Sequence, residues 1–241
     1  MAHGTPDWFA TAQQGLVYRV ADVGELAARM GSPDVHDRRG TVFFITSFDN
    51  GLAGWSYGAS GVGGSCYFVA SPVKTGRGAI TLETGTGDLA YAEITRHLPP
   101  PPSGVWGFEY AFAPDVEMKE TWVEVHNHTA GREHIYGCGY DLELGIVWVF
   151  NSGLAKQTVA TPGKVYAVNN PFSILKMVFD SSNRYYSRVI FNNLVTPLTT
   201  IQGYNAPGGH DRDVEIYIYN ETGRSLNSAV AIDSLVFTSN E

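Results

Sequence analysis

The sequence is poor in cysteine and in clustered positive charge. Its two cysteines, Cys66 and Cys138, are too few to form the disulfide framework of a small secreted domain or a zinc site built from cysteine ligands. Whether they form a single disulfide is left open. Charged residues make up 17% of the chain, the net charge is −8 and no run of Lys or Arg occurs. The electrostatic footprint of a nucleic-acid-binding protein is therefore missing, and we expect no nucleic acid partner.

The sequence also lacks long apolar runs. About 18 consecutive apolar residues would suggest a transmembrane helix, and no such run occurs, so we expect no membrane partner. Residues 1–15 have neither the basic region nor the apolar core of a secretory signal. We therefore expect a protein that is made and used without the secretory pathway. The alternative is a secreted or cell-surface protein from which a signal has been removed.

Glycine and aromatic residues, by contrast, are abundant, with 27 glycines, 13 tyrosines, 12 phenylalanines and 5 tryptophans. From Thr41 onward apolar and polar residues alternate with a period of two, and Gly, Asn, Asp and Pro separate the alternating segments. No helical segment lies between them, which predicts one all-β antiparallel sandwich over residues 41–241. The expected strands cover residues 42–48, 65–70, 79–84, 90–97, 105–112, 121–128, 134–143, 145–151, 173–180, 185–192, 214–220 and 229–238.

Residues 1–40 show a different pattern. Most of this segment has no period and is predicted to be an extended N-terminal arm. One short helix is expected near residues 22–30, because Asp22 and Glu25 form an acidic capping box before an apolar face. A helix of two to three turns is not stable alone in water. It is therefore expected to dock on its own sandwich or on a neighbouring subunit.

Four segments carry a resemblance to a known fold family. The segments FDNGLAGWS, GRGAITLETG, YAEITRHL and VAIDSLVF, at 48–56, 76–85, 91–98 and 230–237, resemble the opening and closing strands of concanavalin A-like jelly rolls of the laminin-G and carbohydrate-binding-module kind. The resemblance implies that the first and last strands pair, with Trp55 closing one end of the core. The opening MAHGTPDW and the segment GELAARMGSP are similar to the starts of bacteriophage structural proteins that carry a lectin-like domain.

Alternation also predicts a chemically rich sheet face. In the strand 121–128 it places tryptophan, glutamate and two histidines on one face and valines on the other. Aromatic rings and carboxylates side by side would suit a sugar, which has an apolar face and a polar rim. A protein contact and an unspecialised surface remain alternatives. The candidate glycan- or partner-binding residues, from three strands, are Trp122, Glu124, His126, Tyr186, Arg188, Glu215, Tyr217 and Tyr219.

Metal-binding and catalytic residues are weaker expectations. His126, His128 and His134 suggest a metal site because neutral imidazoles are metal ligands. Asp141 and Glu143 could form the carboxylate pair of a glycosidase. Hydrolases of the resembled fold, however, carry a Glu-x-Asp-x-x-Glu strand, and no such run occurs. We expect that no cofactor is required. The resemblance implies a calcium site near the joined first and last strands, where the matching residues are Asp49 and Asp233.

Together these features predict a non-catalytic structural or adhesive protein built on a lectin-like jelly roll, with weak glycan affinity as a further expectation. Because it lacks a signal, we expect it in a bacteriophage virion, as a decoration, capsid-associated or tail-adhesion protein. Residues 1–40 would mediate self-association or binding to a capsid or tail scaffold. One alternative is a carbohydrate-binding module or lectin. A second is a glycoside hydrolase or polysaccharide lyase of the same fold.

Overall fold

A computed structural model describes residues 39–129, 131–165, 172–208, 212–223 and 226–241. Within these ranges the chain forms strands and no helix. The strands are β1 (Thr41–Thr46), β2 (Ser56–Ala59), β3 (Ser65–Val69), β4 (Ala79–Glu83), β5 (Tyr91–Leu98), β6 (Val105–Pro114), β7 (Met118–Thr129), β8 (Arg132–Asp141), β9 (Ile146–Phe150), β10 (Lys156–Ala160), β11 (Ser173–Asp180), β12 (Tyr185–Phe191), β13 (Leu194–Pro197), β14 (Tyr204–Pro207), β15 (Val214–Thr222) and β16 (Ala229–Ser239).

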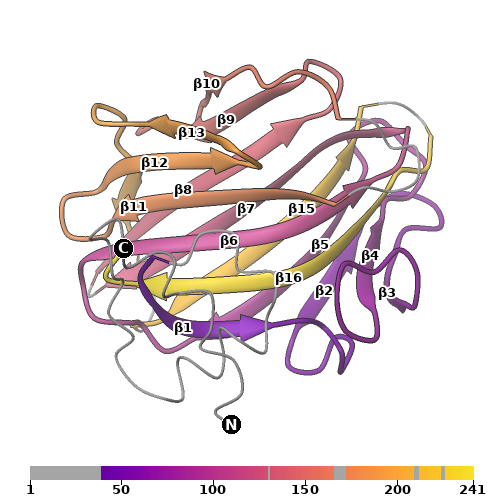
Figure 1. Ribbon diagram of the computed structural model, residues 1–241, viewed down its shortest axis with the longest axis horizontal. Helices are drawn as coiled ribbons and strands as arrows, with labels where there is room; N and C mark the ends of the chain where they lie inside the picture. Colours follow the sequence, from indigo (N-terminus) through magenta and orange to yellow (C-terminus); the bar gives the residue numbers. More distant parts are fainter. Residues whose placement is uncertain (1–38, 130, 166–171, 209–211, 224–225) are drawn as a thin grey trace, which may run out of the picture.

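The strands form two antiparallel sheets that pack face to face as a sandwich (Figure 1). Sheet A has the order β13-β12-β11-β6-β16-β4-β3, and β1 pairs with β16. Sheet B has the order β10-β9-β8-β7-β15-β5-β2, and β14 pairs with β8. Neighbours in these orders are often far apart in sequence, as Greek-key connections require. The predicted all-β jelly-roll sandwich is confirmed.

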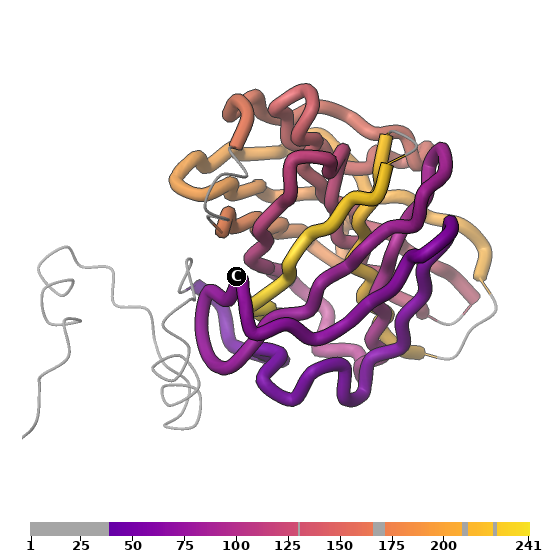
Figure 2. Tube along the Cα trace, turned by 90° about the vertical axis from the view of Figure 1, so that its right-hand side faces the viewer, coloured from indigo at the N-terminus to yellow at the C-terminus, as the bar shows by residue number. Residues whose placement is uncertain are grey.

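The predicted pairing of the first and last strands of the sandwich is also confirmed within the described residues. Strand β1 pairs with β16 from Thr41 opposite Ser239 to Thr46 opposite Leu235. The first part of β16 pairs with β4 instead of β1, so this part of β16 lies between β4 and β6 (Figure 2). Trp55 is buried at this seam, with ring centroids 6.4 Å from Phe44 and 5.5 Å from Phe48.

The core lies between the two sheets and is rich in aromatic rings. Alternation points the valines of β7 and the isoleucines of β15 inward, where they are fully buried. Rings from opposite sheets then meet: Tyr136 stacks on Phe179 with centroids 3.9 Å apart, and Tyr140 stacks on Phe191 at 4.7 Å. Such pairs add about 0.5–1.5 kcal/mol each to the burial of their surface. These contacts fix one sheet against the other.

The two cysteines do not pair. Cys66 on β3 and Cys138 on β8 belong to different sheets, and both are free and buried. The Cys66 thiol lies 3.4 Å from the carbonyl oxygen of Glu93 and 3.6 Å from that of Gly58. Burial raises the pKa of Cys66 to about 11. The sequence left open whether the two cysteines form a disulfide, and the structure shows two separate buried thiols.

The sequence predicted the long strands and missed short ones. All twelve expected strands are present, whereas β2, β10, β13 and β14 were not predicted. These four strands have four or five residues, and every one of those residues is exposed or half-buried. They therefore carry little of the apolar alternation that identifies a strand. The expected helix at 22–30 and nearly all of the expected arm (1–40) lie outside the described residues.

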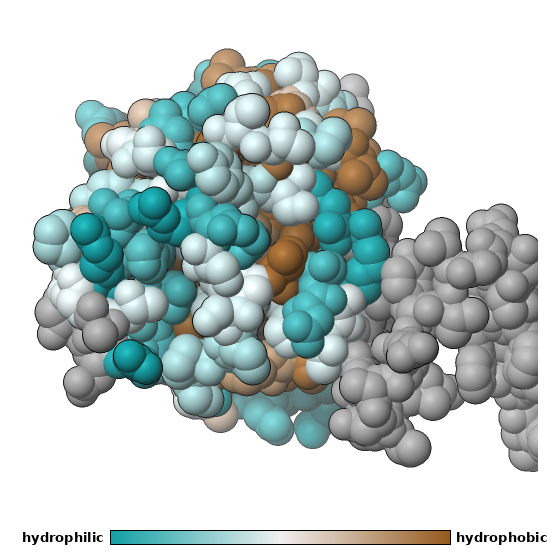
Figure 3. Space-filling model, turned by 90° about the vertical axis from the view of Figure 1, so that its left-hand side faces the viewer, coloured by the Kyte–Doolittle hydropathy of each residue, from teal (hydrophilic) through white to brown (hydrophobic). Residues whose placement is uncertain are grey.

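The surface of the described part is mixed in character. On the face that Figure 3 shows, hydrophobic residues form small groups separated by hydrophilic ones. Among the described residues, no helix has the length and apolar character to cross a bilayer.

Candidate functional site

The outer face of sheet B brings together most of the predicted site residues. Strand β15 lies between β7 and β5, and residues directly opposite one another on antiparallel strands point to the same face. Three rows result from this register. Tyr219 lies opposite Trp122 and Glu93, Tyr217 opposite Glu124 and Thr95, and Glu215 opposite His126 and His97.

One end of this face is a stack of aromatic rings. Tyr219 stacks on Trp122, with centroids 4.6 Å apart and planes at 14°, and lies parallel to Tyr217 at 5.9 Å. The Lys156 ammonium lies 5.0 Å above the Trp122 ring and 4.6 Å above that of Trp148. Only 8% of Trp122 and 2% of Trp148 is exposed. The tryptophans are therefore a supporting layer. The accessible aromatic groups are the half-buried Tyr217 and Tyr219 and the exposed Tyr91, whose ring lies 6.5 Å from that of Tyr219.

Glycine on the neighbouring strand makes room for this layer. Gly139 of β8 lies opposite Trp122 on one side and Trp148 on the other. A Cβ atom at this position would come within 2.4 Å of the Trp148 ring and 2.6 Å of the Trp122 Cβ. No side chain larger than hydrogen fits between the two indoles.

Next to the rings, hydrogen bonds fix a carboxylate and an imidazole. The Trp122 Nε1–H group donates to Glu124 Oε1 at 2.7 Å, and Glu124 Oε2 lies 2.8 Å from His126 Nε2. His126 Nδ1 lies 3.0 Å from Glu133 Oε1. Burial lowers the pKa of His126, but its hydrogen bonds and charge interactions with the two glutamates outweigh burial and raise it. The site therefore favours the imidazolium, which can donate to both carboxylates.

The other end of the face is a second imidazole–carboxylate group around Glu215. The Tyr217 hydroxyl donates to Glu215 Oε2 at 2.5 Å. His97 Nδ1 lies 3.1 Å from Asp213 and 3.3 Å from Glu215, and the buried His128 Nε2 lies 3.6 Å from Glu215. Burial raises the pKa of Glu215, yet the tyrosine hydrogen bond and the neighbouring imidazoles lower it overall. Glu215 is thus held as a carboxylate.

Glu93 is a site residue that the sequence reasoning did not select. Burial raises the pKa of its carboxyl, as does the charge of Glu124, while a hydrogen bond from the Tyr219 hydroxyl opposes the shift. The signal was present, because alternation in YAEITRHL places Glu93 and His97 on one face and Ala92 and Ile94 on the other. Other site residues missed for want of a known strand order are Glu133, Trp148, Lys156 and Asp213.

Two predicted site residues lie elsewhere, on β12 of sheet A. Tyr186 was expected to share a face with Arg188, but it is buried in the core and its hydroxyl lies 2.9 Å from the backbone nitrogen of Gly137. Arg188 contacts Glu241 at 2.6 Å. The cause is an irregularity in the β11–β12 register, where Tyr186 and Arg188 face consecutive residues of β11. Such a bulge breaks the period of two, so this part of the prediction was wrong.

The expected histidine trio and carboxylate pair are also not assembled. His134 lies opposite Asn127, so it points to the other face of sheet B from His126 and His128. Glu143 lies in the turn between β8 and β9, where strand alternation does not apply. Asp141 accepts a hydrogen bond from the Leu144 backbone at 2.7 Å and thereby caps that turn.

The two calcium candidates both hold the loop between β3 and β4. Asp49 accepts hydrogen bonds from the Ser47 hydroxyl at 2.9 Å and from the backbone nitrogen of Arg77. Asp233 accepts hydrogen bonds from the backbone nitrogens of Lys74 and Thr75, at 2.9 and 3.0 Å. Their oxygens thus serve as acceptors for backbone groups, and calcium binding there stays a prediction.

No family model and no curated protein sequence matches the chain. Solved structures do match. A carbohydrate esterase from the Shiga toxin-encoding bacteriophage phi24B is 14% identical with a TM-score of 0.57, over 84% of this chain and 100% of that one. Peanut lectin is 13% identical with a TM-score of 0.51, over 81% and 95%. A sialidase is 9% identical with a TM-score of 0.54, over 84% of this chain.

These similarities establish the fold. The sandwich is a concanavalin A-like, lectin-like jelly roll, as the resemblance in the sequence implied. The chain spans 19% of the sialidase it matches. At 9–14% identity the likeness concerns the backbone, so function has to be argued from the site itself.

Proposed function

We propose that the protein is a non-catalytic glycan-binding protein and that the outer face of sheet B is its binding surface. The observation that carries the proposal is the row of carboxylates beside two stacked tyrosines: Glu93, Glu124 and Glu215 next to Tyr217 and Tyr219. The recessed Glu124 and Glu215 keep 15% of their side-chain surface exposed.

The arrangement suits sugar hydroxyls. A carboxylate has about four acceptor positions, and the hydrogen bonds of Glu124 and Glu215 within the protein leave some of these for a ligand. Hydroxyl groups that donate to a charged acceptor form stronger hydrogen bonds than those between neutral groups. The ring stack and the internal bonds hold the acceptors in place before binding, which reduces the entropy lost when a ligand binds.

The charge of the face favours a neutral glycan. Five carboxylates lie there, Glu93, Glu124, Glu133, Asp213 and Glu215, and the bases that contact them at the ligand-facing end are imidazoles. A surplus of negative charge repels the carboxylates of uronic acids. A chain of neutral hexoses supplies hydroxyl donors without that repulsion.

A glycan array spanning neutral and uronic-acid oligosaccharides, followed by calorimetric titration of the bound sugar, tests this proposal. We expect retention of neutral oligosaccharides and a loss of affinity of at least about tenfold in Tyr217→Ala, since one hydrogen-bonding group of a binding site contributes roughly 1.5 kcal/mol or more. Tyr67→Ala, at an exposed tyrosine of sheet A, is the matched control and should bind normally. Binding of uronic acids alone, or no binding to the whole array, would refute the proposal.

A second candidate function is glycoside hydrolysis on the same face. It is favoured by one observation: Glu93 has a raised pKa, as a general acid needs, while the neighbouring Glu124 bonds to the base His126. If the protein released reducing sugar from a bound polysaccharide, and both Glu93→Gln and Glu124→Gln abolished this release, the protein would be a glycoside hydrolase and not a non-catalytic binding protein. A polysaccharide that is unchanged after long incubation would exclude hydrolysis and favour the binding role.

The biological setting that we propose is a bacteriophage particle, where an adhesive protein would use this face to attach to surface polysaccharide. Support comes from the resemblance of the opening residues to phage structural proteins and from the phage carbohydrate esterase, which is an example of the fold in a phage protein. Self-association through residues 1–40 belongs to the same proposal. Capsid or tail genes beside this gene would support the setting, and a polysaccharide-utilisation cluster would contradict it.

A further inference from the structure

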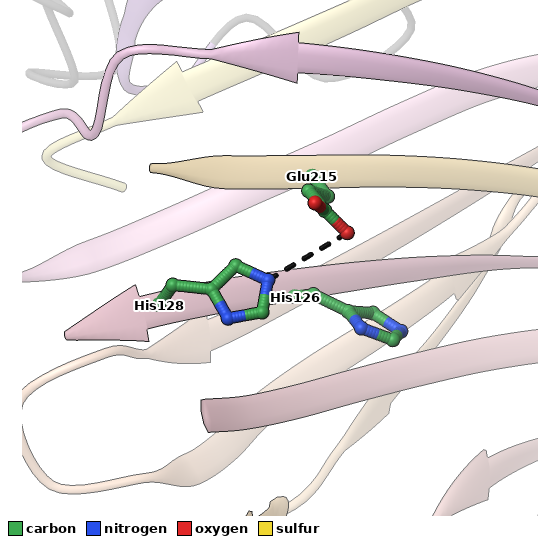
Figure 4. Close-up of side chains that lie close together, drawn as sticks. All are labelled: His126, His128 and Glu215. Carbon is green, nitrogen blue, oxygen red and sulfur yellow. Dashed lines mark ion pairs between the residues drawn. The ribbon is translucent and has the colours of Figure 1, made fainter. Parts of the chain in front are cut away.

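We propose that His126, His128 and Glu215 form a binding site for a divalent transition-metal ion of the Zn²⁺ class. Each of the three residues offers one ligand atom, and these atoms all lie within 4.8 Å of one another. Figure 4 shows Glu215 reaching from β15 toward the two imidazoles, which come from β7. The site differs from the expected histidine trio, because its third ligand is Glu215 and not His134.

Strand geometry brings the three ligands together. His126 and His128 are two residues apart on β7, so both imidazoles lie on the outer face of the sheet. Glu215 lies directly opposite His126 on the neighbouring strand. Zinc–ligand bonds of about 2.0–2.2 Å place tetrahedral ligand atoms roughly 3.4 Å apart. The separation of 3.6 Å between His128 Nε2 and Glu215 Oε2 is already close to this value.

The ligand types select the class of ion. Two imidazoles and one carboxylate are a common set for zinc sites that keep a fourth position open, whereas Ca²⁺ and Mg²⁺ take oxygen ligands. His126 also has Glu133 at 3.0 Å from its Nδ1 atom. An imidazole that binds a metal through one nitrogen usually donates its other N–H to a carboxylate, a backbone carbonyl or water, which orients the ring. Binding through Nε2 would replace the present contact of His126 with Glu124.

The surroundings favour a cation. Within the described part of the chain, Glu124, Glu133, Asp213 and Glu215 contact the imidazoles of this face. Three of these carboxylates, those of Glu124, Glu133 and Glu215, contact His126 or His128, and with neutral imidazoles they give the proposed site three negative charges. His128 is buried and His126 keeps 14% of its side-chain surface exposed, so little water screens these charges. A divalent ion would offset this charge more fully than a proton on one imidazole.

A second set of ligand atoms adjoins the first. His97, Asp213 and Glu215 also lie within 4.8 Å of one another, and the two sets share Glu215. His97 is exposed, with 59% of its side-chain surface open to water. Water competes with protein ligands there, and we therefore assign the ion to the recessed set. The experiment separates the two sets through the histidines that they do not share.

Calorimetric titration of the full chain with ZnCl₂, after removal of metal with EDTA, tests the site. We expect one ion per chain and a visible absorption spectrum of tetrahedral type when Co²⁺ replaces Zn²⁺. Glu215→Gln and His128→Ala should each weaken Zn²⁺ binding by more than about 100-fold, beyond the 10–100-fold typical of residues that only orient a ligand. His134→Ala, on the opposite face of the same sheet, is the matched control and should leave affinity unchanged.

Since His128 is buried, circular dichroism should first show that the variant folds; if it does not, His126→Gln takes its place. No binding of Zn²⁺ by the native chain would overturn the proposal. So would a loss of binding in His97→Ala with normal binding in the His128 or His126 variant, which would assign the ion to the exposed set. The glycan-binding proposal does not depend on either result, because its titrations can be done with EDTA present.

Discussion

Two groups of charged side chains, one on each sheet, are arranged in opposite ways. On sheet A, Lys176 and Arg188 each lie 2.6 Å from a different oxygen of Glu241, and the side chains of Lys176 and Glu241 are 1% and 0% exposed. On sheet B, carboxylates outnumber the imidazoles that they contact, and Glu124 and Glu215 remain partly open to water. In the first group, both oxygens of the buried Glu241 are already in contact with cations. The second has spare acceptors within reach of a ligand.

This difference separates a structural role from a binding role. A buried ion pair whose partners are all in place offers nothing to a ligand, and losing one partner leaves an uncompensated charge. Partly exposed carboxylates held by neighbouring side chains can accept further bonds without rearrangement. We therefore propose a binding role for the outer face of sheet B and a stabilising role for the Lys176–Glu241 group.

The largest expected effect concerns sheet A. Lys176→Met should lower the free energy of unfolding by about 3–5 kcal/mol, because it leaves the buried Glu241 with one cation fewer. Lys119→Met is the matched control: Lys119 is 28% exposed and lies 2.8 Å from Glu221 and 3.4 Å from the buried Glu120, which keeps Lys156 at 2.6 Å. Its loss should therefore cost less, about 1 kcal/mol. Urea unfolding curves measure both. Equal effects of the two substitutions would contradict the structural role of the Lys176 group.

A smaller effect is expected from filling the space between the indoles of sheet B. Gly139→Ala places a methyl group against Trp148 and Trp122, and overpacking of this kind costs about 1–3 kcal/mol. It should also weaken glycan binding, because Trp122 orients Glu124. Gly153→Ala, where the added Cβ has an ordinary contact at 3.4 Å, should change neither quantity. Normal glycan affinity in a destabilised Gly139→Ala protein would show that the aromatic layer does not preorganise the site.

The smallest expected effect is a pH dependence of stability. The pKa of His126 is raised in the folded protein, so its contribution is fully present below the unfolded value of about 6.5 and is lost as pH rises through the folded pKa. His126→Gln should therefore lower the melting temperature more at pH 6 than at pH 9, with EDTA present throughout. Melting curves of both proteins between these limits provide the measurement. Parallel curves would show that His126 gains no proton affinity from Glu124 and Glu133.

The sequence predicted which side chains of β7 and β15 lie on the outer face of sheet B, but not which residues of other strands lie beside them. Alternation in WVEVHNH and VEIYIY placed Glu124, His126, Glu215 and Tyr217 on the outer face without any structure. Alternation did not show that β5 pairs with β15, since that contact joins residues about 120 positions apart. Long-range pairing depends on the whole fold, so Glu93 went unselected although its strand was predicted.

Local irregularities account for the remaining errors. A bulge in β12 turns the Tyr186 side chain toward the core. The register of the β7–β8 hairpin places His134 opposite Asn127 and not opposite His126. One residue of register moves a side chain to the other face of a sheet. Sequence patterns alone do not fix such single-residue shifts.

The most direct test of the binding surface is a titration of the isotope-labelled protein with an array-selected neutral oligosaccharide, followed by NMR. We predict that the largest changes in amide chemical shift fall on residues 122–126 of β7 and 215–219 of β15, while residues 174–178 of β11 on sheet A do not respond. Changes confined to sheet A, or to the loops, with β7 and β15 unaffected, would contradict the assignment of function to sheet B.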